Sequence, residues 1–124
     1  MRGQRRYSQG RVRERWTRED AAPRLADEIT SLQQLTLEIE ESLGDAVIDA
    51  ARYVRHILVD QAPAHFEVPC SDSKCEGGGH DITQGVMEAL RAGETDFGGE
   101  STCRGQSGSD PCQRVLRFTA RAEY

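Results

Sequence analysis

The chain has 124 residues, of which 36% are hydrophobic, and a formal net charge of −5. This length allows one domain with a small core. No stretch approaches the roughly 20 consecutive apolar residues of a transmembrane helix, so we expect no membrane partner.

Charge is divided unevenly along the chain. Residues 1–18 contain one acid, Glu14, and seven arginines, which gives them a charge of +6 and leaves −11 on residues 19–124. The arginines are Arg2, Arg5, Arg6, Arg11, Arg13, Arg15 and Arg18. Because this segment has few apolar residues, we expect a disordered basic arm in front of a single domain over residues 19–124. The arm either binds a polyanion, with Tyr7 and Trp16 stacking on bases, or is a solvated tail without a ligand.

The first half of the domain has three predicted elements. A short helix is expected over residues 23–31, because proline suits its first turn. Apolar and polar residues then alternate over 35–40, which predicts a half-buried strand with an acidic outer face, broken at Gly44 and Asp45. Residues 46–60 fit either a helical stripe or a strand. We favour a strand from about residue 52 to residue 60, since Val, Ile and Tyr suit a pleated surface.

The second half contains one clear helix and several short strands. Asp81 is placed to cap this helix, with Gln84 as its capping-box partner, and Gly93 is placed to end it. Strands are expected over residues 65–68, 95–102 and 115–120. Together these elements predict an α+β fold with a small antiparallel sheet and one or two helices.

Four cysteines form two close pairs. Four residues separate Cys70 from Cys75, 27 residues follow, and eight separate Cys103 from Cys112. Two such pairs can supply four thiolates to one tetrahedral ion, and Zn²⁺ is the expected metal. The alternatives are two disulfides, or free structural or redox thiols. The first residues lack the apolar stretch of a signal peptide, so we expect a cytoplasmic protein, in which paired cysteines favour metal binding.

The two cysteine loops, VPCSDSKCEGGGHD and STCRGQSGSDPCQR, resemble zinc-ribbon and zinc-knuckle domains over residues 66–118. This resemblance implies a zinc-ribbon-like C-terminal half. Paired cysteines in zinc ribbons are usually separated by two residues, and the longer loops here depart from that pattern. The combined motifs are also similar to a group of uncharacterised bacterial proteins. A bacterial source with a GC-rich genome also fits a composition of 15 arginines and one lysine.

His80 is a further candidate for the metal site. It lies five residues after Cys75 and next to Asp81. These two residues are candidates for an alternative ligand or an outer contact of the metal, and the other interpretation is that they only begin a helix. The deaminase signature and the nucleophile-elbow motif are both missing, so we do not expect an enzyme.

Three functions are compatible with these features. The first is a small zinc-stabilised interaction module that contacts a protein partner through its acidic body, with the arm assisting. The second is a nucleic-acid-binding or ribonucleoprotein-associated protein that docks through the arm, and a minor third is a redox-sensitive zinc-thiolate sensor. A body charge of −11 argues against direct contact between the body and nucleic acid, which favours the first function.

Overall fold

A computed structural model describes residues 13–43, 46–72 and 75–124. Its main element is a four-stranded antiparallel sheet with the strand order β2-β1-β9-β6. These strands are β1 (Gln34–Leu43), β2 (Ala46–Ile57), β6 (Asp96–Thr102) and β9 (Arg114–Glu123). Two smaller antiparallel sheets, β3-β5 and β4-β7-β8, lie beside it. They are built from β3 (Glu67–Val68), β4 (Cys75–Glu76), β5 (His80–Asp81), β7 (Gln106–Ser107) and β8 (Asp110–Pro111).

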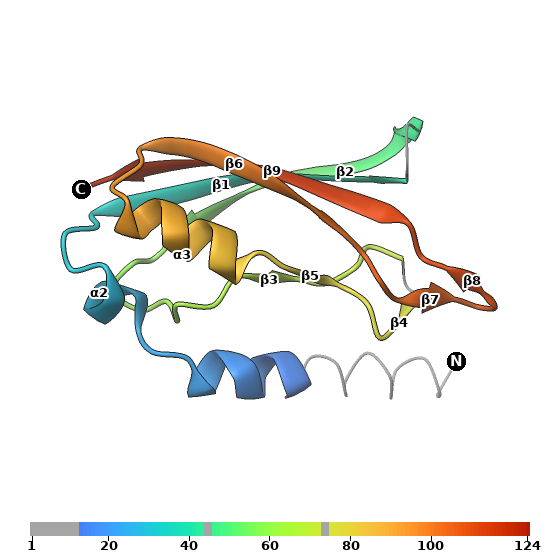
Figure 1. Ribbon diagram of the computed structural model, residues 1–124, viewed down its shortest axis with the longest axis horizontal. Helices are drawn as coiled ribbons and strands as arrows, with labels where there is room; N and C mark the ends of the chain where they lie inside the picture. The colour runs from blue at the N-terminus through green and yellow to red at the C-terminus, as the bar shows by residue number, and fades with distance from the viewer. Residues whose placement is uncertain (1–12, 44–45, 73–74) are drawn as a thin grey trace.

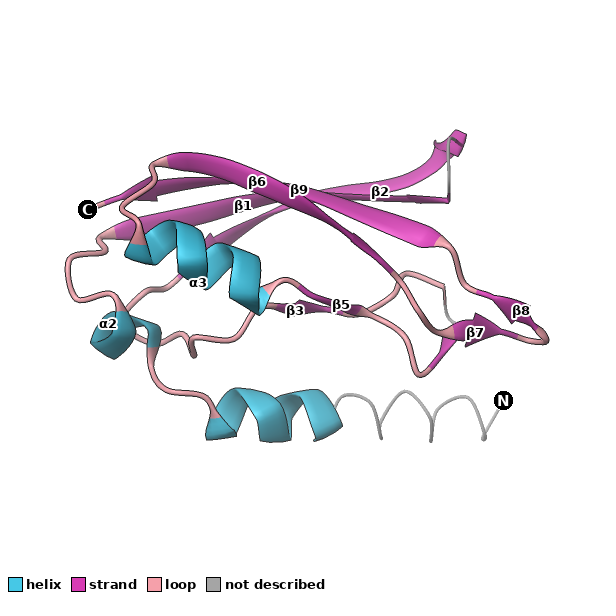
Figure 2. Ribbon diagram, viewed as in Figure 1, coloured by secondary structure: helices cyan, strands magenta, loops and turns pink. Residues whose placement is uncertain are grey.

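All helices in the described part of the chain lie on one side of the main sheet (Figures 1 and 2). They span residues 13–21, α2 (Leu25–Glu28) and α3 (Thr83–Arg91). The predicted α+β class is therefore confirmed, with three helices instead of one or two. The predicted helix over residues 23–31 is reduced to the single turn of α2. Among the described residues, no helix is long and apolar enough to cross a membrane.

The alternating pattern of β1 is confirmed. Leu35, Leu37 and Ile39 are at most 2% exposed and face the helices. The last strand, β9, pairs with β1 along ten residues, with Ile39 opposite Phe118. Its inward side chains are Leu116, Phe118, Ala120 and Ala122, all buried. Two central strands with the same period therefore supply most of one wall of the core.

The ambiguous region after β1 is a strand. β2 pairs with β1 so that Glu40 lies opposite Arg52 and Leu35 opposite Ile57. The strand begins at Ala46, earlier than the expected residue 52, because the long partner β1 extends the ladder. The predicted break at Gly44 and Asp45 lies outside the described residues.

The start of α3 differs in detail from its prediction. The cap position is Ile82, whose side chain makes no capping hydrogen bond. Asp81 Oδ1 instead accepts a hydrogen bond of 3.0 Å from the Thr83 N–H. Gln84 donates to Glu88 Oε1 at 3.1 Å, so the capping box is not formed. The start of α3 is positioned by β5, which lies immediately before the helix and pairs with β3.

The end of α3 is as predicted. Gly93 has a φ of +72°, which favours glycine. The N–H groups of Gly93 and Glu94 donate to the carbonyls of Leu90 and Ala89, at 3.0 Å each. The buried face of the helix consists of Val86, Met87, Ala89 and Leu90.

The basic arm differs from its prediction at its C-terminal end. Residues 13–18 were expected to be disordered, but they belong to the helix over residues 13–21. Arg18 anchors this helix, because its Nε atom donates to Glu67 Oε1 at 2.7 Å. Arg15 adds an ion pair with Glu19 at 3.7 Å. Residues 1–12, which hold the rest of the arm, lie outside the described residues.

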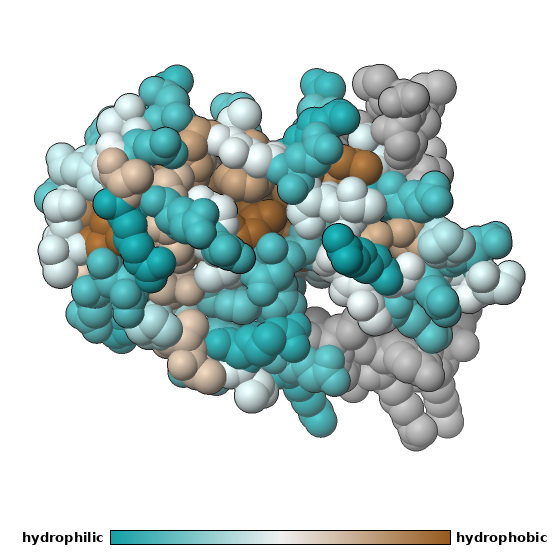
Figure 3. All heavy atoms as spheres, viewed as in Figure 1, coloured by the Kyte–Doolittle hydropathy of each residue, from teal (hydrophilic) through white to brown (hydrophobic). Residues whose placement is uncertain are grey.

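The buried residues fall into two groups. The main core lies between the sheet and the elements beneath it, and the three buried cysteines form a separate cluster. On the face seen in Figure 3 the surface is mostly hydrophilic, with small separated apolar patches. Since the two groups of buried residues are separate, the cysteine cluster is not part of the main apolar core.

Candidate metal centre

The four cysteines lie at or near the ends of strands. Cys70 follows β3, Cys75 begins β4, Cys103 follows β6, and Cys112 precedes β9. Backbone hydrogen bonds close the second loop, because the Cys103 N–H donates to the Arg114 carbonyl and the Cys112 N–H to the Gly105 carbonyl, at 2.8 Å each. The pairing of β4 with β7, in which Cys75 lies opposite Ser107, joins the first loop to the second. The fold therefore brings two loops that are 27 residues apart in the sequence to one point.

The sulfur atoms have the spacing of a tetrahedral site. All four lie within 4.8 Å of one another. The closest pairs are Cys70 with Cys112 at 3.7 Å and Cys75 with Cys103 at 3.6 Å. A tetrahedral ion with metal–sulfur bonds of about 2.3 Å places its sulfurs about 3.8 Å apart, whereas a disulfide holds them at about 2.05 Å. The four cysteines are free, so they could together hold a metal ion.

Glycines bring backbone close to the sulfurs. Gly78 and Gly105 pack so tightly on the cluster that a Cβ on Gly105 would lie 2.5 Å from Cys75 Sγ. Gly79, at a φ of +126°, donates its N–H to Cys103 Sγ at 3.3 Å. These glycines therefore let backbone approach the sulfurs and leave space around the cluster.

The surroundings of the thiols favour the neutral form at two positions. Burial raises the pKa of Cys70 well above its ordinary value and raises that of Cys75 to about 12. Burial also acts to raise the pKa of Cys103, but hydrogen bonds from the Gly105 and Gly79 N–H groups hold it below its ordinary value. A bound dication would compensate the charge of four thiolates, which is why such clusters bind metal and release protons.

His80 lies outside the sulfur cluster. Its ring is fully buried, with Nδ1 3.2 Å from Ser101 Oγ and Nε2 3.6 Å from Glu41 Oε2. Burial lowers the pKa of His80, and the nearby Glu41 carboxylate offsets part of this effect. Among the residues that the structure describes, this buried Nε2 atom has no hydrogen-bond partner. The four-sulfur group is complete without His80, which instead reaches the cysteine loop through Glu41.

Glu41 was not predicted to be part of the site. Its carboxylate is 2% exposed, and Oε1 accepts hydrogen bonds from the Ser71 N–H at 3.1 Å and the Ser71 hydroxyl at 2.8 Å. The same oxygen lies 3.8 Å from Cys70 Sγ. The alternation of β1 contained the signal, since a residue two positions after inward-facing Ile39 also faces inward. Glu41 thus ties the first cysteine loop to the main sheet.

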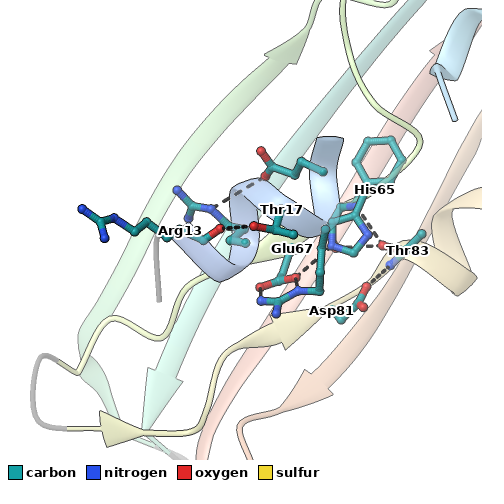
Figure 4. Close-up of polar contacts among 10 residues, drawn as sticks. Arg13, Thr17, His65, Glu67, Asp81 and Thr83 are labelled. Atoms are coloured by element: carbon teal, nitrogen blue, oxygen red, sulfur yellow. Dashed lines mark hydrogen bonds and ion pairs between the residues drawn. The ribbon is translucent and has the colours of Figure 1, made fainter. Parts of the chain in front are cut away.

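A second polar cluster joins the basic helix to the body (Figure 4). His65, Glu67 and Asp81 bring their polar atoms within 4.8 Å of one another. His65 Nε2 lies 2.8 Å from Glu67 Oε1, and Arg18 binds both oxygens of Glu67. The hydrogen bond from Arg18 lowers the pKa of Glu67. Asp81 therefore lies beside the Arg18 contact, and not beside the cysteines.

The remaining arginines of the arm divide at residue 12. Arg13 and Arg15 lie in the helix with Arg18, and Arg13 is exposed. Arg2, Arg5, Arg6 and Arg11 lie outside the described residues.

Comparison with known proteins adds no family to this geometry. The sequence matches no family model, and no curated protein or solved structure is significantly similar to it. The similarity to zinc ribbons therefore rests on four cysteines that lie close together and could bind a metal ion.

Proposed function

We propose that the chain is a small zinc-stabilised interaction module. The observation that carries the proposal is the pair of sulfur distances, 3.6 and 3.7 Å, in a group of four converging cysteines. Four thiolates complete the tetrahedral coordination of Zn²⁺ and leave no position for a water or a substrate. Such a site is structural, so the metal supplies stability and not catalysis.

The proposed role of the metal is to hold the cysteine loops on the body. Strands β4, β7 and β8 contain two residues each, and the cysteine cluster lies apart from the main core. Such short strands are not stable alone. Because an unfolded chain lacks the site, zinc binding adds directly to the folding free energy of these loops.

The open face of the main sheet is the proposed surface for a protein partner. Its acids lie beside arginines of neighbouring strands, as in the pairs Glu40 with Arg52 at 3.1 Å and Glu100 with Arg117 at 3.0 Å. A groove of about 510 Å³ crosses this face and includes Glu38 and Val54. A surface with both charge signs and exposed apolar atoms suits a protein better than a polyanion.

A second candidate function is supported by the basic helix. Arg13 and Trp16 are exposed, and Trp16 retains 55% of its accessible surface. An exposed indole next to arginines can stack on a nucleic-acid base while the arginines contact phosphates. In this alternative, the module docks through residues 13–21 and the sheet is a scaffold.

Elemental analysis with thiol titration tests the metal. We expect about one zinc per chain in the purified protein, and loss of zinc in Cys75→Ser but not in the exposed control Ser109→Ala. Chelation should broaden or shift the NMR signals of the cysteine loops while signals of β1, β9 and α3 stay in place. Protein without metal in which all four thiols are unreactive would indicate disulfides and refute the proposal.

Two surface variants separate the candidate functions. Glu38→Arg should weaken capture of a protein partner if the open sheet is the interface, and Trp16→Ala should leave that capture unchanged. The affinity of both variants for a generic RNA or DNA oligomer is then measured at two salt concentrations. Salt-dependent binding that is lost in Trp16→Ala selects nucleic acid, because phosphate contacts release counterions.

A further inference from the structure

The four sulfurs of the proposed zinc centre are unequally exposed. Cys75 and Cys103 are each 1% exposed and Cys112 is 6% exposed. Cys70 is only half-buried. A reagent in solution therefore meets Cys70 before it can reach any other member of the cluster.

Cys70 lines a cleft beneath the basic helix. The cleft has a volume of about 230 Å³, and its walls include Arg15 and Arg18 from the helix and residues 77–79 from the glycine loop. The helix that covers it buries no large apolar side chain, and its ties to the body include the Arg18–Glu67 contact. Such a volume holds several water molecules or a small solute. Because the covering helix buries no large apolar side chain, it is weakly fixed, and small reagents can enter the cleft.

The sulfur is also held in place at the cleft. The next residue, Ser71, is fixed by two hydrogen bonds to buried Glu41, and the Asp72 N–H hydrogen-bonds the Cys70 sulfur. Cys112 Sγ is 3.7 Å away and is buried. The Cys70 sulfur is thus accessible, and the Cys112 sulfur is close enough to react with it.

We propose that Cys70 is the site at which this metal centre reacts with small oxidants such as hydrogen peroxide, with Cys112 as its resolving partner. The inference rests on the proposed zinc centre, where both sulfurs are thiolates. Cys70 attacks the peroxide: an S–O bond forms, the O–O bond breaks, and hydroxide leaves. Cys112 then attacks the Cys70 sulfur, an S–S bond forms, and the second hydroxide leaves. Two sulfurs lose two electrons in total, one peroxide becomes two waters after protonation, and zinc loses two ligands.

Oxidation of Cys70 and Cys112 would loosen only the cysteine loops. Cys75 and Cys103 keep their 3.6 Å contact beneath the glycine loop, and the main core does not include the cysteines. Two remaining thiolates bind zinc far more weakly than four. The expected outcome is zinc release with loosened loops on an intact sheet, so an oxidant would switch off the zinc-held surface and leave the body folded.

The test uses the full chain after its zinc content has been measured. The protein is treated with limiting N-ethylmaleimide, or with hydrogen peroxide, and the modified cysteines are mapped by mass spectrometry. Buried sulfurs react only after a local opening, and each 1.4 kcal/mol of opening free energy slows them about tenfold. We therefore expect Cys70 to react at least about tenfold faster than the other three, and a Cys70–Cys112 disulfide after peroxide treatment.

A pair of arginine variants tests the cleft without altering a metal ligand. Arg18→Ala removes the anchor of the covering helix and should speed the modification of Cys70. Arg91→Ala, on α3, removes an ion pair with Glu28 of α2 and should leave the rate unchanged. Zinc-loaded protein in which another cysteine reacts first, or all react equally, overturns this inference alone. Protein that binds no zinc overturns the proposed function together with this inference.

Discussion

Gly105→Ala tests whether the cysteine loops are shaped around a metal. A Cβ at this position would lie 2.5 Å from Cys75 Sγ, 2.6 Å from the Glu76 carbonyl oxygen and 2.7 Å from Gly78 Cα. Ordinary van der Waals contact begins at 3.4 Å, so the nearest atom would have to move by about 0.9 Å, the difference between 3.4 and 2.5 Å. Two of the three atoms belong to the backbone, and the third is a buried sulfur that the proposed metal would hold in place.

The size of the effect follows from that displacement. Overpacking in a closely packed site costs about 1–3 kcal/mol. Metal–ligand distances tolerate only about 0.2 Å, so a shift of the Cys75 sulfur removes it from ideal coordination. We therefore expect the upper end of this range, and about 3 kcal/mol corresponds to zinc affinity weakened roughly 100-fold.

The assay is competition for zinc with a chromophoric chelator, and Gly85→Ala is the matched control. A Cβ at Gly85, on α3, would meet no atom within 4 Å. This control should keep wild-type zinc affinity and gain about 0.5–1 kcal/mol of stability, because alanine is the better helix former. Wild-type zinc affinity in Gly105→Ala would refute the argument, and so would an equal loss in both variants.

Three further predictions concern the polar groups around the site. Glu41→Ala should weaken zinc binding more than Glu41→Gln, which keeps an acceptor for the cysteine loop, as chelator competition would show. Burial lowers the pKa of His80, so as pH falls the unfolded chain takes up a proton on this histidine before the folded protein does. The free energy of unfolding should therefore fall as pH drops below about 6.5. Urea unfolding should show less of this loss in His80→Gln than in the exposed control His56→Gln. Arg18→Ala should let the pKa of Glu67 rise, because the hydrogen bond from Arg18 is what lowers it, and NMR titration of Glu67 measures the change. The ion pair stabilises the fold above the ordinary carboxyl pKa, and this stability is lost as pH falls through the lowered pKa.

Local patterns predicted the elements that depend on near neighbours in the sequence. The alternation in β1 and the glycine after α3 each act over a few residues, so both were visible without a structure. The four-cysteine group was predictable for a different reason, because paired spacing directly expresses the needs of a tetrahedral ion. What spacing could not give is the closest sulfur contacts, which join Cys70 to Cys112 and Cys75 to Cys103 across the two loops.

The features that were missed depend on distant contacts. The predicted alternation of β1 ended at residue 40 and left Glu41 without a role, and Ser71, which Glu41 binds, is 30 residues away. Residues 13–18 were predicted to be disordered because the arm has few apolar residues to bury, and the helix is instead tied to Glu67, 49 residues from Arg18. In both cases a buried or half-buried carboxylate supplied a partner that sequence patterns do not reveal.

The strand order has a consequence for the time course of folding. β9 is the last strand in the sequence, yet it lies in the middle of the main sheet, between β1 and β6. During synthesis the first two strands can form a hairpin, but β6 has no strand partner in the main sheet until residues 114–123 emerge. Contacts between such distant segments form slowly, and in the proposed zinc-bound form a metal held by Cys70 and Cys112 would shorten the loop that β9 must close to reach β1. On that proposal zinc supply would govern how quickly newly made chains mature. Removal of the last ten residues would split the sheet at its centre.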